Sequence, residues 1–143
     1  MNGIKMSDCR FYVNEAERTV VCVIPNTKEA FHDYIYANFR FKDTDLYLML
    51  TSDFEDKLLL PNSFMGKAVC SVDDKWDEDL GRMIAFSRAK DKFYRSFFKR
   101  ANLLVNTIDI QTNHMIDVFN TMGAKLDERK LALEHMIETH VSK

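Results

Sequence analysis

The chain has 143 residues, of which 46% are hydrophobic and 29% charged, and its formal net charge is −2 at pH 7. This length suits one compact domain or a small domain with a helical appendage, and the apolar content excludes a disordered chain. A net charge this close to zero argues against a protein that binds nucleic acid over its whole surface. Only four glycines and two prolines are present, which favours long helices over an all-β fold with many turns.

The sequence shows no basic-then-apolar leader and no run of about 18 apolar residues, the length that crosses a bilayer. We therefore expect a cytoplasmic protein with no membrane partner. The three cysteines, Cys9, Cys22 and Cys70, are odd in number and lie in apolar or strand-like surroundings. We expect them to be reduced thiols.

Two β-rich runs open the chain, at residues 9–13 and 19–24, with a polar stretch of hairpin-loop length between them. The second run is almost wholly apolar, which predicts a central strand covered on both faces. Pro25 ends this run, and Asn26 or Thr27 is then placed to cap a helix. The helix is expected to lay an aromatic face on the sheet through residues at helical spacing: Phe31, Tyr34, Ile35 and Phe39.

Three further strand candidates follow, at residues 45–51, 57–60 and 64–71. Pro61, Asn62 and Ser63 are typical of a turn between the last two. The chain changes character at Ser71, because acidic residues then crowd the segment 73–79. A helix N-terminus at this point would be stabilised by that negative charge.

From Leu80 onward the pattern is helical, with one apolar stripe in steps of three and four residues: Met83, Phe86, Phe93, Phe97, Ala101, Leu104, Ile108, Met115, Val118 and Met122. The stripe predicts either one very long helix or two helices with a break within residues 102–106. Gly123 is expected to end or hinge this region. Residues 126–137 are expected to form a last amphipathic helix.

A second apolar edge runs beside the stripe: Leu80, Ile84, Tyr94, Phe98, Val105, Ile116 and Phe119. One small sheet cannot cover so much apolar surface, so we expect helices to pack on one another and favour a homo-oligomer. The elements together predict an α+β fold, in which a small antiparallel sheet with one packed helix precedes long C-terminal helices that mediate oligomerisation. The expected division is a sheet-plus-helix part at 1–76 and a long-helix part at 77–143.

A third face of the long helical region is basic. Four residues fall within roughly 60° of one another at the helical period, and three more flank them: Arg88, Lys92, Arg95 and Lys99, then Arg82, Lys90 and Arg100. Only Asp91 is acidic between the first and last of these. Two interpretations stay open: a solvated face opposite the core, or a site for the phosphate groups of a nucleotide or a nucleic acid.

The common catalytic and metal-binding patterns are missing. The aspartates at 73–79 lack the glycine and glutamate spacing of a calcium-binding EF-hand, and the four histidines are scattered with no zinc-binding spacing. The sequence also contains no nucleophile elbow around a serine and no glycine-rich phosphate loop. We therefore expect no catalytic residue, no metal and no cofactor.

Two segments resemble landmarks of small proteins from phages of Gram-positive bacteria. Residues 11–22 resemble their opening hairpin. Residues 66–70, Gly-Lys-Ala-Val-Cys, lead through Asp74 and Trp76-Asp77 into a helix with Gly81-Arg82, Ile84-Ala85 and Arg88-Ala89-Lys90. On these segments, about the first 90 residues, the chain resembles the phage anti-Thoeris proteins that form the first of the Tad families.

The resemblance implies a non-enzymatic oligomer that binds and sequesters a cyclic ADP-ribose immune signal, or a cyclic oligonucleotide, in the cytoplasm of an infected bacterium. It carries over Arg82 and Arg88 as binding residues. Combined with the basic face, it gives an expected ligand site in which cations meet phosphates and aromatic rings stack on adenine: Arg82, Arg88, Lys92 and Arg95, with Phe11, Trp76 and Tyr94. The alternatives are an inhibitor that binds a host defence protein directly and an accessory protein that binds nucleic acid, which the net charge disfavours.

Overall fold

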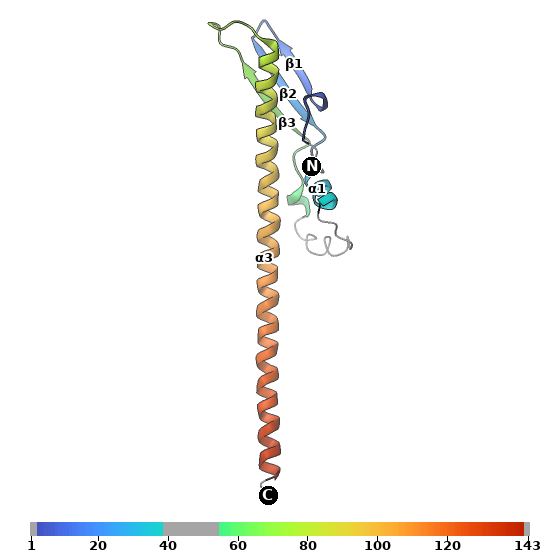
Figure 1. Cartoon of the computed structure of the whole chain (residues 1–143), viewed down its shortest axis with the longest axis vertical. Coiled ribbons are helices and arrows are strands. Elements are labelled where there is room, and N and C mark those ends of the chain that lie inside the picture. The colour runs from blue at the N-terminus through green and yellow to red at the C-terminus, as the bar shows by residue number, and fades with distance from the viewer. Residues whose placement is uncertain (1–2, 39–54, 142–143) are drawn as a thin grey trace. The chain divides into compact units, whose positions relative to one another are not determined.

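The computed structural model describes residues 3–38 and 55–141 (Figure 1). The expected α+β fold is confirmed, as three antiparallel strands in the order β1-β2-β3, a short helix and a long C-terminal helix. The elements are η1 (Met6–Asp8), β1 (Arg10–Asn14), β2 (Thr19–Pro25), α1 (Ala30–Asn38), η2 (Glu55–Leu58), β3 (Ser63–Val69) and α3 (Glu78–Val141). The strand expected at 45–51 and the packing expected of Phe39 lie outside the described residues.

The hairpin of β1 and β2 forms where the sequence predicts it, with Tyr12 paired to Val21. Its turn is held by polar groups of the connecting residues. The Glu17 amide donates to Asn14 Oδ1 at 3.1 Å, and the Arg18 amide donates to the Glu15 carbonyl at 3.1 Å. Arg18 has a φ of 54°, the left-handed conformation that lets the chain re-enter the second strand.

The sheet buries only one of its faces among the described residues. Along β2 the residues alternate between buried and half-exposed, with Val20, Cys22 and Ile24 turned inward. The expectation that this strand is covered on both faces is therefore wrong. On the other face Val21 and Val23 are half-exposed, because antiparallel sheets tolerate one solvated side even when the strand is apolar throughout.

The first part of α3 crosses the buried face at very short range. A Cβ atom at Gly66 would lie 2.1 Å from the Ala85 carbonyl oxygen and 2.4 Å from the Ala89 amide nitrogen. Ala85 and Ala89 are fully buried. The helix backbone can approach β3 this closely only because none of the three residues carries a large side chain.

Aromatic rings fill the core next to this crossing. Phe97 packs edge-on against Phe31 of α1 at 5.2 Å between ring centroids, and Phe93 packs edge-on against Phe64 of β3 at 5.6 Å. Ile35 is also buried, so the predicted inward face of α1 is confirmed at Phe31 and Ile35. Edge-on pairs of this kind stabilise a core beyond their area burial.

Three local predictions are corrected. Residues 57–60 form the end of η2 and an irregular segment rather than a strand, and the Leu60 amide donates to the Lys28 carbonyl at 3.0 Å. The helix α1 begins at Ala30 rather than directly after Asn26 or Thr27, and the Thr27 hydroxyl donates to the Pro61 carbonyl at 2.5 Å. Gly123 neither ends nor hinges a helix, since α3 continues through it and through residues 102–106 to Val141.

The chain divides into two compact units, Met1–Leu104 and Val105–Lys143. The first contains the sheet, α1 and the first part of α3, with every residue of the buried core. The second consists of the remainder of α3, and its residues 112–140 are all exposed. No described helix has an apolar stretch long enough to cross a membrane.

Candidate functional site

Two of the predicted binding cations, Arg88 and Lys92, lie along the open edge of the sheet. The Cys70 amide donates to the Arg18 carbonyl at 2.8 Å. Since bonding groups alternate along an antiparallel strand, the carbonyls of Met65 and Lys67 must point away from β2. Arg88 Nη1 donates to the Lys67 carbonyl at 2.6 Å, and Lys92 Nζ donates to the Met65 carbonyl at 2.8 Å.

These two bonds fix the side chains without neutralising them. A carbonyl oxygen is an uncharged acceptor, so the guanidinium of Arg88 and the ammonium of Lys92 keep their full positive charge. Both groups also retain free donors, because a guanidinium has five N–H bonds and an ammonium three. The edge of β3 therefore carries two positioned cations with capacity to bind an anion.

The other predicted cations differ, because each is paired with a carboxylate on the same helix. Arg95 Nη2 lies 2.9 Å from Asp91 Oδ2, and Arg82 Nε lies 3.3 Å from Glu78 Oε2. Both pairs are solvent-exposed, so each contributes little to stability. Their main effect is to reduce the positive charge that an incoming anion would meet at these two residues.

A groove runs beside the edge cations along the first part of α3. It has a volume of about 690 Å³ and is lined by Lys67, Leu80, Met83, Ile84, Ser87, Arg88, Asp91, Lys92 and Arg95. We call this the edge groove. Four basic residues and one acidic residue line it, next to exposed apolar side chains such as Met83 at 58%. It thus combines positive charge with an apolar surface.

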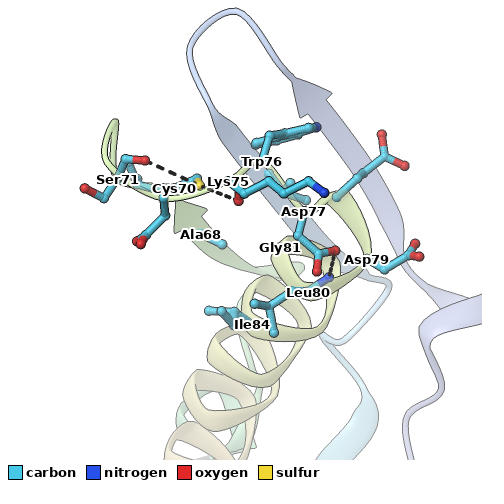
Figure 2. A pocket seen from close by; sticks show the side chains of 14 residues that line it. Ala68, Cys70, Ser71, Lys75, Trp76, Asp77, Asp79, Leu80, Gly81 and Ile84 are labelled. Carbon is cyan, nitrogen blue, oxygen red and sulfur yellow. Dashed lines mark hydrogen bonds between the residues drawn. The ribbon is translucent and has the colours of Figure 1, made fainter.

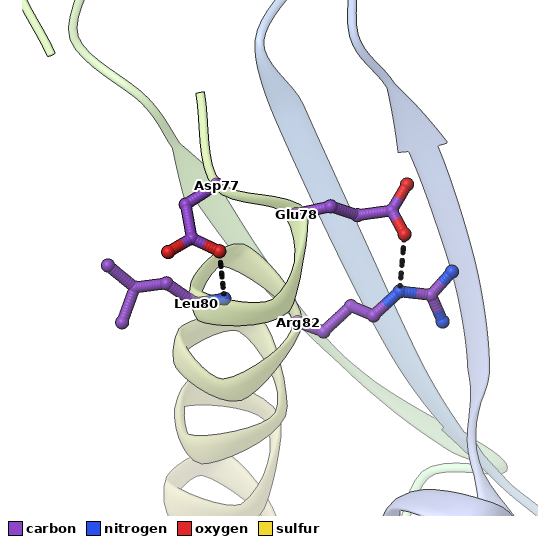
Figure 3. Close-up of polar contacts among 4 residues, drawn as sticks. All are labelled: Asp77, Glu78, Leu80 and Arg82. Atoms are coloured by element: carbon purple, nitrogen blue, oxygen red, sulfur yellow. Dashed lines mark hydrogen bonds and ion pairs between the residues drawn. The ribbon is translucent and has the colours of Figure 1, made fainter. Parts of the chain in front are cut away.

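Arg82 and Phe11 lie together but outside the edge groove. The Arg82 guanidinium carbon is 5.1 Å from the centroid of the Phe11 ring, a cation–π arrangement. Figure 3 shows Arg82 reaching toward Glu78 at the start of α3, on the side that faces the hairpin. These two predicted residues therefore form a local contact of their own, and the groove lining includes neither of them.

Trp76 lines a different cleft, of about 870 Å³, at the start of α3 (Figure 2). Four carboxylates surround this cleft, from Asp74, Asp77, Glu78 and Asp79, against one lysine, Lys75. The acidic lining disfavours a phosphate-bearing ligand by charge repulsion. Within this unit, Trp76 therefore does not line the same groove as Arg88, Lys92 and Arg95, the cations predicted to meet phosphates.

Tyr94 also lies apart from the edge groove. Its ring packs edge-on against Phe93 with 5.3 Å between centroids, and it is half-buried. It borders a shallow surface depression that also includes Phe98, Lys99 and Arg100. Of the seven predicted site residues, the edge groove therefore brings together three, Arg88, Lys92 and Arg95.

Arg18 has a structural role that the sequence did not reveal. Its Nη2 donates to Cys70 Sγ at 3.2 Å, to the Ser71 carbonyl at 2.9 Å and to the Asp74 carbonyl. One guanidinium thus ties the end of the hairpin to the segment that leads into α3. The only local signal is its position next to a turn, which does not predict contacts more than fifty residues away in sequence.

Two of the three cysteines, Cys9 and Cys22, have thiols with raised pKa values. Cys22 is fully buried, and burial is the main cause that raises its pKa to about 12, with Cys9 beside it adding to the effect. Burial also raises the pKa of Cys9. A thiol with a raised pKa carries little of the reactive thiolate at neutral pH. Among the described residues, no cluster of histidine, cysteine and carboxylate side chains could hold a metal ion.

Searches against protein-family models, curated proteins and solved structures each find no match to this chain.

Proposed function

We propose that this protein binds and sequesters a phosphate-bearing cyclic nucleotide of the cyclic ADP-ribose type, or a cyclic oligonucleotide, without transforming it. The observation that supports this proposal best is the pair of cations at the edge groove. Arg88 and Lys92 are positioned by neutral carbonyl acceptors. Their charges are therefore available to phosphate oxygens at little cost in side-chain ordering.

The composition of the groove fits such a ligand in two respects. Lys67 adds positive charge near the two edge cations, as two phosphate groups of one ligand would require. Leu80, Met83 and Ile84 provide an apolar surface against which a base or ribose can lie. Sequestration needs tight binding alone, so it requires none of the acid–base or nucleophilic groups that an enzyme uses.

The test is a thermal-shift titration with cyclic ADP-ribose isomers and cyclic di- and trinucleotides. A ligand that binds only the folded state at a hundred times its Kd stabilises it by about 2.7 kcal/mol, which raises Tm by several degrees. The ligand is then recovered and analysed by mass. Intact recovery supports sequestration, whereas a hydrolysed or rearranged product contradicts it.

Charge reversal at the groove identifies the site. Arg88→Glu is expected to remove the ligand-induced shift, because it places a carboxylate where a phosphate should bind. Lys99→Glu is the matched control, since Lys99 lies on the same helix but does not line the edge groove. The melting temperature without ligand must be measured for both variants, because Arg88 also satisfies the Lys67 carbonyl. No shift with any ligand, or equal loss in both variants, contradicts the proposal.

A further inference from the structure

The second unit of the chain is one helical segment whose apolar side chains are largely exposed. Residues 112–140 are all exposed, and the large apolar side chains among them leave from 43% of their surface open at Val118 to 68% at Leu126. An isolated helix has little stability in water, and most helical stability in proteins comes from packing an amphipathic face. Asn120, Thr121 and Gly123 are also poor helix formers.

The apolar residues of this unit form a straight stripe. At 100° per residue, seven of them fall within roughly 60° of one another: Ile108, Met115, Phe119, Met122, Leu126, Leu133 and Ile137. Their numbers repeat at a separation of 18, as in Met115 and Leu133 or Phe119 and Ile137. Eighteen residues correspond to about five full turns at 3.6 residues per turn, so the stripe does not drift around the helix.

We propose that this stripe packs in parallel and in register against the same segment of a second copy of the chain. The inference does not depend on the edge groove or its ligand. Steps of seven residues also occur within the stripe, at Ile108, Met115 and Met122 and at Phe119, Leu126 and Leu133. A seven-residue spacing is the pattern by which two helices pack along an apolar seam and wind around each other with a left-handed supercoil. Val118 and Met136 lie beside the stripe and extend the apolar surface on one side.

The surface is large enough for a stable association. Full burial of a large aliphatic side chain removes roughly 80 Å² of apolar surface from water. Nine such residues, the seven of the stripe with Val118 and Met136, therefore remove about 700 Å² per chain. Stable protein–protein interfaces bury about 800 Å² per partner, so the stripe supplies most of the required area.

Charges on the two sides of the stripe determine the parallel orientation. One side carries Lys125 and Arg129 and no carboxylate. The other carries one base and four acids: Lys130, then Asp109, Asp127, Glu134 and Glu138. In a parallel pair each side faces the opposite side of the partner, so the basic side of one helix meets the acidic side of the other. An antiparallel pair would set the basic side against itself.

The first experiment is the mass of the full-length protein in solution, by light scattering after size exclusion. Wild type is expected to contain at least two chains. Leu126→Glu is expected to weaken self-association at least about tenfold, because it buries a carboxylate in the stripe. Leu131→Glu is the matched control, since Leu131 is 66% exposed, close to Leu126 at 68%, but lies on the opposite side of the helix. Leu131→Glu should leave the mass unchanged.

Cysteine cross-linking tests the orientation. The native thiols, Cys9, Cys22 and Cys70, all lie in the first unit, and wild type under the same oxidant controls for them. Met115→Cys and Leu133→Cys should each form an intermolecular disulfide on their own if the helices are parallel and in register. Cross-links that appear only when the two variants are mixed indicate an antiparallel pair. That result, a monomeric wild type, or equal effects of the two glutamates would overturn the proposal.

Discussion

Residues 78–104 of α3 bury Ala85, Phe93 and Phe97 in the core of the first unit, whereas residues 112–140 of the same helix are exposed along their whole length. Both segments carry an apolar stripe in steps of three and four residues. The difference between them is therefore a difference in what covers the stripe. Helical periodicity identifies the apolar face of a helix, but it does not identify the surface that packs against that face.

The small residues, glycine and alanine, show a second difference between the two segments. In the first segment the closest contacts come from Ala85 and Ala89, which lie against Gly66 of β3. In the second segment a Cβ atom at Gly123 would meet no atom within 4 Å beyond its chain neighbours and the backbone of its own helix. Small residues in the first segment allow two backbones to meet, whereas the small residue in the second has no such partner among the described residues.

The largest expected effect on the free energy of unfolding comes from replacing Gly66, which lies against the first segment, with alanine. The same replacement at Gly123, in the second segment, provides the comparison. Gly66→Ala is expected to destabilise the protein by about 3 kcal/mol or more, because its Cβ would overlap backbone atoms of α3 that cannot move independently of the helix. Gly123→Ala is expected to stabilise the protein by about 1 kcal/mol, because alanine is the better helix former and nothing obstructs it. Urea denaturation of both variants measures the two values. Equal effects of the same sign would contradict the close approach at Gly66.

The strands and the long helix could be predicted from sequence because their patterns are local. β2 and β3 show apolar runs bounded by turn residues, and α3 begins where acidic residues give way to helical spacing. The packing at Gly66 could not be predicted, since alanine and glycine contribute little to an apolar stripe. The expectation that Gly123 ends or hinges the helix was wrong, because glycine is only mildly unfavourable within a helix and does not by itself end one.

The candidate site was only partly predictable for the same physical reason. Helical spacing places Arg88, Lys92 and Arg95 on one face, and they do line one groove. The carbonyls that hold Arg88 and Lys92 belong to β3, more than twenty residues earlier in the chain. Which strand a helix face meets is a tertiary property, so these contacts do not follow from spacing along the chain. The acidic surroundings of Trp76, by contrast, come from its neighbours in the sequence, the acidic segment 73–79.

A smaller effect on the free energy of unfolding is expected in the first unit, from the buried thiol of Cys22. The pKa of Cys22 is raised to about 12 in the folded protein from an ordinary value of 9.0. Folded protein therefore holds this proton more tightly than unfolded protein. The contribution is fully present below pH 9.0, and it is lost as the pH rises from 9.0 toward 12, at about 1.4 kcal/mol per pH unit.

The measurement compares urea denaturation of wild type and Cys22→Ala at pH 8 and pH 10. Wild type is expected to lose about 1.4 kcal/mol more than the variant between these two values. Other groups titrate in the same range, so only the difference between the two proteins reports on Cys22. Parallel losses in both proteins would show that burial of this thiol does not oppose its ionisation.

The smallest expected effect concerns the residue at which α3 begins. Asp77 Oδ1 accepts a hydrogen bond from the Leu80 amide at 3.1 Å (Figure 3). The Asp77 carbonyl accepts from the Gly81 amide at 3.0 Å. Asp77 is therefore the N-cap of the helix, and its charge also interacts favourably with the helix dipole. Asp77→Ala is expected to cost about 1 kcal/mol, and Asp77→Asn less than half of that, because asparagine keeps the acceptor.

Asp73→Ala provides the control for this last prediction. Asp73 belongs to the same acidic segment, but it precedes the helix and caps no amide of α3 in the described contacts. If the acidic segment acts only through its general negative charge, the alanine variants of Asp73 and Asp77 should lower the free energy of unfolding equally. A loss confined to Asp77→Ala would instead assign the effect to the single hydrogen bond from the Leu80 amide to the Asp77 carboxylate, which caps the first turn of α3.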